Sequence, residues 1–345
     1  MNNNILIFFV ASPLQIIIAD SIKKQFYTDK NHKKIKAFLV CYSRPLSKIP
    51  IESKWDSIVH LLPPRKNPNR GLFGVSSKIL ENLLLIHSML DSKSSINIFA
   101  ASYDSETLNY FVSFFRKTRN SCFFHLIPDG LLNLVINAKT PSNMFLKKLR
   151  WFRRLYDSNL QYTNYMGDRL GSEAEFIKTI YTIPGILTNY SKEKTREISF
   201  LKKGPKSSKF YSDQNKVLIV GQPLLGFKLV TIDQCNAIST RIFDWLVLNN
   251  FNEVYYKKHP RDCNSNLYHK SYELIKDDII IEEYMQKNFF KYVIGVHSSV
   301  LIFAKQIYGE MSTVISFGMD RVLFKNNELK ARLTETYKNL DIVIK

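Results

Sequence analysis

Three short polar motifs in this chain each follow an apolar run, at a point where a strand is expected to end. They are His259-Pro260 after 253–258, Asp129-Gly130 after 122–127, and Ser298-Ser299 after 292–296. The carboxyl ends of strands line the ligand crevice of open α/β sheets. A carboxylate, an imidazole and paired hydroxyls at three such ends therefore predict one distributed site for group transfer.

Each motif has a chemical role that suits transfer of a group from a phosphate to a hydroxyl. Asp129 can act as the general base that takes the proton of an attacking hydroxyl. His259, if protonated near neutral pH, can neutralise the charge that grows on a leaving phosphate. Ser298 and Ser299, at the start of an expected helix, can hold phosphate oxygens.

Every motif also has an ordinary structural explanation. Asp-Gly is a common turn dipeptide, paired serines often cap helices, and a histidine before proline can simply end a strand. Taken together, the three motifs favour the functional interpretation.

Length and composition bound the class of protein. The chain has 345 residues, of which 45% are hydrophobic, so it can bury a full core and exceeds the usual size of one domain. The formal net charge of +19 indicates anionic partners or surroundings, such as lipid headgroups, phosphorylated carriers or nucleic acid. The four cysteines lie far apart without a Cys-x-x-Cys pair, which argues against a zinc site and favours a reducing compartment.

The apolar run 5–19 predicts a buried strand and the start of a helix, rather than a signal peptide. It has no basic region before it, and Ser12-Pro13 and Gln15 interrupt it. No other stretch is long and apolar enough to span a bilayer. A cytoplasmic protein is expected, with any membrane role peripheral.

Short β-branched or aromatic runs alternate with helical periodicity, which is typical of β-α units on parallel sheets. Strands are predicted at 5–10, 36–42, 96–100 and 122–127, with helices at 77–90 and 106–116. In the second half, strands are predicted at 216–220, 253–257, 278–281, 291–294 and 313–316, with helices at 232–248 and 299–308.

The polar and basic segment 191–214 predicts a linker between two domains. Residues 1–190 would form an N-terminal Rossmann-like domain on the acceptor side. Residues 215–345 would form a C-terminal Rossmann-like domain that binds the donor, and its last helix could pack back on the first domain. Two such α/β domains facing each other across a cleft are the arrangement called GT-B.

The order of the motifs resembles the bacterial sialyltransferases and polysialyltransferases. The resemblance is carried by Ser12-Pro-Leu-Gln15, Asp129-Gly130, Gly221-Gln-Pro-Leu224, His259-Pro260 and Ser298-Ser299. It implies inverting transfer of sialic acid from CMP-sialic acid to a sugar hydroxyl of a galactoside or sialoside. The acceptor would be a bacterial surface glycan such as lipooligosaccharide, O-antigen or capsule.

One position departs from that resemblance. The families usually carry two acidic residues before the glycine, whereas Pro128 holds the first place here and Asp129 keeps the second, the catalytic base. The chain also lacks an Asp-x-Asp motif and a Walker-type phosphate loop. No metal ion and no cofactor are therefore expected.

Further candidates have two interpretations each. Glu282 and Glu283 could bind ribose hydroxyls or form a solvated helix start. Gly221, Gln222 and Pro223 could border the nucleotide or form a structural turn, and Ser12 and Gln15 could reach the sugar, with a helix cap as the alternative for Ser12. His125 is predicted to be a core histidine.

The segment 145–156 predicts an amphipathic helix with Phe145, Leu149, Phe152 and Tyr156 on one stripe and basic residues on much of the remainder. Such a helix could lie on an anionic membrane, which would suit a lipid-linked acceptor, or its stripe could pack on the domain.

Two other functions remain open. One is a different metal-independent GT-B transferase of surface-polymer synthesis, moving a polyol phosphate or another sugar. The other is a basic nucleic-acid-binding protein, although the aromatic residues follow core patterns and no RNA-binding signature is present.

Overall fold

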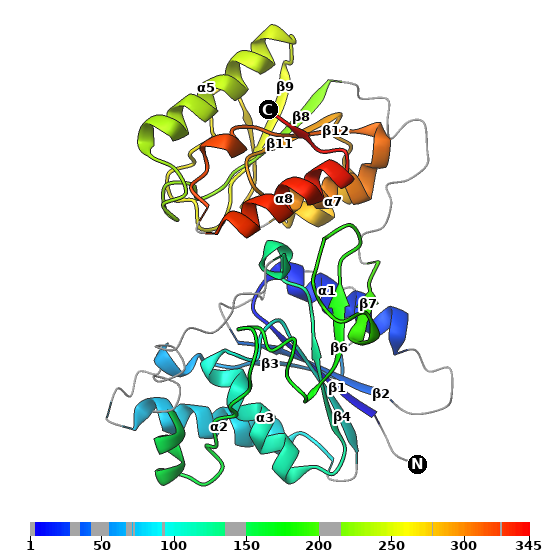
Figure 1. Cartoon of the computed structure of the whole chain (residues 1–345), viewed down its shortest axis with the longest axis vertical. Helices are drawn as coiled ribbons and strands as arrows, with labels where there is room; N and C mark the ends of the chain where they lie inside the picture. The colour runs from blue at the N-terminus through cyan, green and yellow to red at the C-terminus, as the bar shows by residue number, and fades with distance from the viewer. Residues whose placement is uncertain are drawn as a thin grey trace. The chain divides into compact units, whose positions relative to one another are not determined.

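The structure is a computed structural model that describes residues 4–27, 35–42, 55–66, 71, 73–91, 94–134, 150–199, 215–277, 279–324 and 326–345. The chain divides into two compact units, each with its own sheet and core (Figure 1). The first comprises Met1–Pro184 and Thr188–Phe200, and the second comprises Gly185–Leu187 and Leu201–Lys345. Each unit is described by itself below.

The first unit contains a seven-stranded parallel sheet in the order β3-β2-β1-β4-β5-β6-β7. The strands are β1 (Asn4–Val10), β2 (Ile35–Cys41), β3 (Ser57–His60), β4 (Ser95–Ala100), β5 (Cys122–Leu126), β6 (Ile177–Thr182) and β7 (Thr195–Glu197). The α-helices are α1 (Pro13–Phe26), α2 (Gly74–Ser88) and α3 (Glu106–Thr118). Short 3-10 helices are η1 (Pro64–Lys66), η2 (Gly130–Asn133), η3 (Arg150–Leu155) and η4 (Lys192–Lys194).

The central strands are apolar on both faces, as expected for a parallel sheet covered by helices. Residues 5–10 of β1 are almost completely buried. Across β1, β4 and β5, Phe99 stacks on Phe8 at 4.1 Å and on His125 at 4.6 Å between ring centroids. His125 Nε2 lies 3.1 Å from Asn97 Oδ1, and burial lowers the pKa of His125 to about 3. The prediction of a core histidine is confirmed.

The second unit contains a six-stranded parallel sheet in the order β10-β9-β8-β11-β12-β13. Its strands are β8 (Lys216–Val220), β9 (Glu253–Lys257), β10 (Glu273–Ile275), β11 (Tyr292–Gly295), β12 (Thr313–Ser316) and β13 (Val343–Ile344). Its α-helices are α5 (Ile232–Leu248), α6 (Ile281–Lys287), α7 (Ser299–Tyr308) and α8 (Asn327–Asn339), with 3-10 turns η6 (Gly309–Met311) and η7 (Met319–Arg321).

The strand predicted at 278–281 is wrong. Ile281 begins α6, and the strand in this region is β10, which ends at Ile275. Ile280 is buried just before the helix. A short apolar run does not by itself distinguish a strand from a buried helix start, because it spans too few residues to show a period.

The C-terminal helix α8 packs on the second unit, where Leu333 and Tyr337 are fully buried. Gly185 also belongs to this unit, and a Cβ added to it would lie 2.7 Å from Leu340 Cδ2. Within the described ranges, no helix is long and apolar enough to cross a membrane.

The strand order reverses between β1 and β4 in the first sheet and between β8 and β11 in the second. In doubly wound sheets, ligands bind outside the carboxyl ends of the strands at this switch point. The loops after β8 and β11, and those near β1 and β4, are therefore where a site is expected.

Candidate active site

Asp129 lies in a turn after β5, at the carboxyl edge of the first sheet, and is half-buried. Its backbone N–H donates to Asn133 Oδ1 at 2.6 Å, and Asn133 Nδ2 donates to the hydroxyl of Tyr190 at 3.2 Å. Gly130 follows with φ of 57°, a left-handed conformation that favours glycine. The carboxylate of Asp129 does not cap η2. The turn is thus held by the amide of Asn133, a residue that the sequence analysis did not identify.

Tyr42, directly after β2, is electrostatically coupled to Asp129. Burial raises the pKa of the Tyr42 hydroxyl, and the negative charge of Asp129 raises it further. The tyrosine therefore stays neutral and can donate a hydrogen bond near the carboxylate. Tyr42 was also not identified from the sequence.

Ser12 and Gln15 hold the turn between β1 and α1. Ser12 Oγ accepts the N–H of Gln15 at 3.3 Å, so Ser12 is the N-cap of α1. The side chain of Gln15 is buried, and its Oε1 accepts the N–H of Ala11 at 2.7 Å. The helix-cap interpretation of Ser12 is confirmed.

In the second unit, Gly221 allows the ends of β8 and β9 to come close together. Its N–H donates to the carbonyl of Lys257 at 2.8 Å. A Cβ at this position would lie 2.5 Å from the Tyr256 hydroxyl and 2.9 Å from that carbonyl oxygen. No side chain fits there, which accounts for the glycine as part of a structural turn.

Gln222 uses its whole side-chain amide to join β8 to β11. Its Oε1 accepts the N–H groups of Val296 at 2.9 Å and His297 at 2.8 Å. Its Nε2 donates to the His297 carbonyl and lies 3.2 Å from His297 Nδ1. Gln222 is buried, so it shapes the loop after β11 and the described contacts leave no amide atom for a ligand. Pro223, next to it, is buried as well.

His259 follows β9 and is half-exposed, while Pro260 is exposed. Its Nδ1 accepts the N–H of Arg261 at 3.0 Å. A neutral ring must therefore carry its proton on Nε2, the nitrogen left to donate to a ligand. Burial lowers the pKa of His259, and the charge of Arg261 lowers it further, against an opposing effect of Asp262. In the free protein, His259 thus favours a neutral ring with an Nε2–H donor over the protonated ring expected from the sequence. An anion bound nearby would raise the pKa of His259 again.

The loop after His259 is organised by Asp262, which is buried. Asp262 Oδ2 accepts the N–H of Asn266 at 3.1 Å and the hydroxyl of Tyr256 at 3.3 Å. The Asp262 side chain therefore ties Asn266 to Tyr256 of β9, and its backbone N–H donates to the carbonyl of His259 at 2.9 Å.

Ser298 caps α7, with its Oγ accepting the N–H of Val300 at 3.2 Å. The Ser298 hydroxyl hydrogen remains able to donate. Ser299 is the first residue of α7, so its N–H has no intrahelical partner. No other residue of the described ranges bonds to its N–H or hydroxyl. The structure therefore assigns the capping role to Ser298, while the N–H and hydroxyl of Ser299 have no partner within the described ranges.

Glu282, in the first turn of α6, is buried, so the solvated helix start is wrong for this residue. Burial raises its pKa to about 7; the charge of Glu283 acts in the same direction, and Lys257 opposes it. Glu283 is half-buried. A carboxyl group with this pKa can be protonated or ionised near neutral pH, and both forms can bind hydroxyls.

The candidate residues of the second unit follow the carboxyl ends of three strands of its sheet. Gln222, His259 and Ser298-Ser299 follow β8, β9 and β11, which are neighbouring strands in the order β9-β8-β11. Asp129 and Ser12 occupy the same edge of the first sheet, after β5 and β1. Within the described ranges, no three His, Cys, Asp or Glu side chains cluster as metal ligands would.

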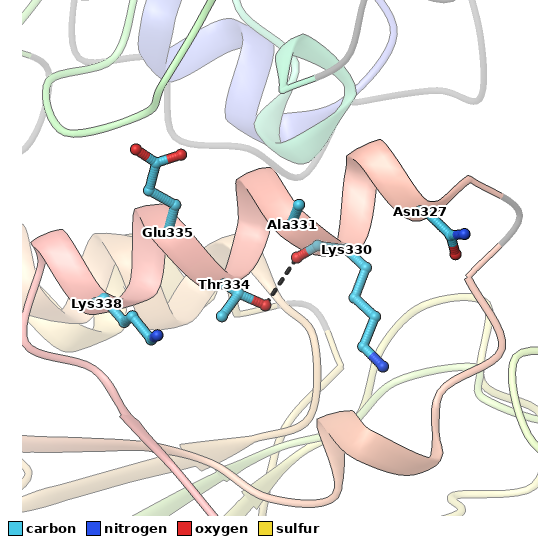
Figure 2. Close-up of a pocket in the computed structure, with 6 residues that line it drawn as sticks. All are labelled: Asn327, Lys330, Ala331, Thr334, Glu335 and Lys338. Atoms are coloured by element: carbon cyan, nitrogen blue, oxygen red, sulfur yellow. Dashed lines mark hydrogen bonds between the residues drawn. The ribbon is translucent and has the colours of Figure 1, made fainter.

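A hollow of about 450 Å³ lies along α8 (Figure 2). All the residues that line it come from this one helix: Asn327, Lys330, Ala331, Thr334, Glu335 and Lys338. None of the sequence-predicted site residues is among them. The hollow is thus an open face of α8 that holds none of the candidate residues.

The fold is similar to that of solved sugar-nucleotide enzymes. One is an α/β-galactoside α-2,3-sialyltransferase from Photobacterium phosphoreum, with a TM-score of 0.52, 12% identity, and coverage of 100% of this chain and 99% of that one. Another is a UDP-GlcNAc 2-epimerase from Neisseria meningitidis, with a TM-score of 0.51, 11% identity, and coverage of 99% and 94%. Two Rossmann-like domains with these neighbours define the GT-B class.

The family model described as alpha-2,8-polysialyltransferase (POLYST) matches residues 6–316, and the chain belongs to this family. Comparison with curated proteins finds no significant match. The protein is therefore a glycosyltransferase, a sialyltransferase as the order of motifs predicted. Membership of a family of enzymes argues against the alternative of a non-enzymatic nucleic-acid-binding protein.

Proposed function

We propose that this sialyltransferase transfers sialic acid from CMP-sialic acid to a sugar hydroxyl, with inversion and without a metal ion. The observation that carries the proposal is the position of His259 and Ser298-Ser299 at the carboxyl ends of β9 and β11, the two strands on either side of β8. One phosphate with its sugar can be held there by a neutral imidazole N–H and the groups of Ser299.

In the proposed reaction, the acceptor oxygen attacks the anomeric carbon of sialic acid while the bond from that carbon to the phosphate oxygen breaks. Asp129 takes the hydroxyl proton, and CMP leaves with the bonding electrons. His259 Nε2–H and the Ser299 N–H and hydroxyl donate to the phosphate as its charge grows. A single displacement inverts the anomeric configuration.

Glu282 is assigned to the ribose. Its buried carboxyl lies near Lys257 at the end of β9 and can accept hydrogen bonds from ribose hydroxyls when ionised. Binding of hydroxyls to the ionised form would lower its pKa from the free-state value.

The proposed acceptor is a sialoside on a bacterial surface glycan such as lipooligosaccharide, O-antigen or capsule. The family description favours α-2,8 linkage to a sialic acid. The net charge of +19 suits an acceptor that carries carboxylates. A galactoside acceptor is the second choice from the motif order.

The deciding experiment is donor hydrolysis across a panel of CMP, CDP, UDP and GDP sugars, followed by transfer from the active donor to sialoside and galactoside acceptors in EDTA. Hydrolysis of CMP-sialic acid alone and transfer to a sialoside would support the proposal. Activity only with a polyol phosphate or a different sugar nucleotide would replace it with the other GT-B transferase. Loss of activity in EDTA that Mg²⁺ restores would overturn metal independence.

A peripheral membrane contact is also proposed, through an exposed aromatic and basic surface around η3. The described part of the predicted amphipathic helix is this 3-10 helix, while residues 145–149 lie outside the described ranges. Of the predicted stripe, Phe152 is 56% exposed and Tyr156 42% exposed, and Leu155 beside them is 76% exposed, so none of the three is buried in the domain. Phe73 stacks on Tyr156 at 5.3 Å, and both are exposed.

The same helix is anchored on its other side. Arg153 donates to Glu106 Oε1 at 2.6 Å and to the Tyr110 hydroxyl at 3.0 Å. Arg154 lies over the ring of Trp151, 3.6 Å from its centroid, and is exposed. Amphipathic aromatic rings beside arginine are the composition that binds an anionic lipid interface.

Sedimentation with vesicles tests this contact. The wild type should bind vesicles that contain phosphatidylserine more strongly than vesicles of phosphatidylcholine alone, and Phe152→Ser with Leu155→Ser should abolish the difference. Val247→Ser with Leu248→Ser is the matched control, because these exposed apolar residues lie on α5. Equal binding of the η3 variant and the wild type would rule out this surface.

A further inference from the structure

Tyr337 connects the C-terminal helix to the proposed phosphate loop. It lies on α8, is fully buried, and is located beyond residues 6–316, the part of the chain that the family model matches. Its hydroxyl accepts the N–H of Ser298 at 3.0 Å and donates to the carbonyl of the same residue at 3.1 Å. One side chain thus bonds to both backbone groups of Ser298, whose carbonyl also accepts the N–H of Leu301 at 3.2 Å.

These contacts complete an ordered set along the loop after β11. Gln222 takes the N–H groups of Val296 and His297, and Tyr337 takes that of Ser298. The N–H of Val300 is taken by the Ser298 hydroxyl. Ser299 is the one residue from 296 to 300 whose N–H has no partner within the described ranges.

We propose that Tyr337 is a positioning residue of the donor-phosphate site. By holding both backbone groups of Ser298, it fixes the plane of the peptide that precedes Ser299. The N–H and hydroxyl of Ser299 then face the phosphate without first having to be ordered, which reduces the entropic cost of binding. This inference rests on the proposed function, because it takes Ser299 as the phosphate-binding residue.

The test compares Tyr337→Phe with Tyr308→Phe. Tyr308 is the matched control, since it is also a buried tyrosine of the second unit, and its hydroxyl donates to the carbonyls of Met285, at 2.9 Å, and Asn288. CMP affinity is measured by calorimetric titration and stability by thermal melting of the same samples. The donor and acceptor KM values are measured separately.

We expect Tyr337→Phe to weaken CMP affinity and raise the donor KM by roughly 5- to 10-fold, with an unchanged acceptor KM. Each variant loses a buried hydroxyl, so the two should lower the melting temperature to a similar extent. Tyr308→Phe should leave CMP affinity unchanged. Unchanged CMP affinity in Tyr337→Phe, or an equal loss in both variants, would overturn the inference.

Ser299→Ala separates this inference from the proposed function. If Ser299→Ala and Tyr337→Phe both weaken CMP binding, both proposals are supported. If only Ser299→Ala weakens it, the phosphate site stands and the positioning role of Tyr337 fails. If neither Ser299→Ala nor Tyr337→Phe weakens it, the phosphate site itself fails, and the inference fails with it.

Discussion

Gln222 Oε1 accepts the N–H of His297 at 2.8 Å, although 75 residues separate the two in the chain. The bond joins the ends of β8 and β11, the two strands that flank the switch point of the second sheet. A buried amide with all its groups satisfied rigidifies the loop that leads into Ser298 and Ser299. The loop that carries the proposed phosphate site is therefore held in place by an amide whose own groups are all used within the protein.

Asp129→Asn is expected to lower the rate of transfer by about 10²- to 10⁴-fold, because the amide cannot take the proton of the acceptor hydroxyl. CMP affinity should not change, since Asp129 acts on the acceptor. Transfer assays and calorimetric titration measure the two effects. Near wild-type turnover would show that Asp129 is only a turn residue.

Asn133→Ala should act on the position of Asp129. The change removes the acceptor for the Asp129 N–H and the donor to the Tyr190 hydroxyl. We expect the free energy of unfolding to fall by about 1–3 kcal/mol and the kcat of transfer to fall, with unchanged CMP affinity. Tyr190→Phe is the control, because it removes the outer bond and keeps the one to Asp129. Equal kcat values in the two variants would contradict a direct effect on Asp129.

The two serines should separate binding from stability. Ser299→Ala is expected to weaken CMP affinity, by about 1–2 kcal/mol, and leave the melting temperature unchanged. Ser298→Ala, in contrast, should lower the free energy of unfolding by about 1 kcal/mol, because it removes the N-cap of α7. If Ser299→Ala melted early and bound CMP normally, the assignment of the two roles would be wrong.

His259→Ala should impair both transfer and hydrolysis of the donor, because both reactions release the same phosphate. His269→Ala is the matched control: its Nδ1 also accepts the N–H two residues ahead, from Ser271 at 3.3 Å, but it lies outside the three motifs. Both variants lose the same local bond, and only His259→Ala should lose activity. Normal donor hydrolysis by His259→Ala would remove this residue from the site.

Glu282 should make the stability of the protein depend on pH. Its pKa rises from its usual value of 4.5 to about 7 in the folded chain. Between these two pH values, the folded state binds a proton that the unfolded state has lost. The contribution of Glu282 to the free energy of unfolding therefore falls as the pH rises from 4.5 to about 7, and it stays constant above pH 7. The loss is on the order of 3 kcal/mol.

Glu282→Gln should remove that contribution. The melting temperature of the variant, relative to wild type, should rise between pH 5 and pH 8. The same variant should weaken CMP binding if the carboxylate holds the ribose. If the difference in melting temperature between Glu282→Gln and the wild type did not change with pH, the Glu282 carboxyl would have its usual pKa.

Several elements could be predicted to the residue from sequence, namely β8, β9, β12, α5 and α7. Their signals are local. The helix α5 begins at a Thr231-Gln234 capping box, and α7 begins after the N-cap Ser298. The unpredicted strands β3, β7, β10 and β13 are short, with two to four residues each, so they show little periodicity. The strand β6, with six residues, was missed although its pattern is mostly buried.

The sequence by itself determined the family, the alternation of strands and helices, and the placement of the three motifs after strands, because these depend on residue type and on hydrogen bonds within a few residues. Only the tertiary structure decided which polar groups are already satisfied. It assigns Gln222 and Tyr337 to the loop around Ser298, and Asn133 to the turn of Asp129. The contacts of Gln222 and Tyr337 join residues 75 and 39 positions apart in the chain. Their partners are set by strand order and helix packing, which bring distant segments together and leave no local pattern in the sequence.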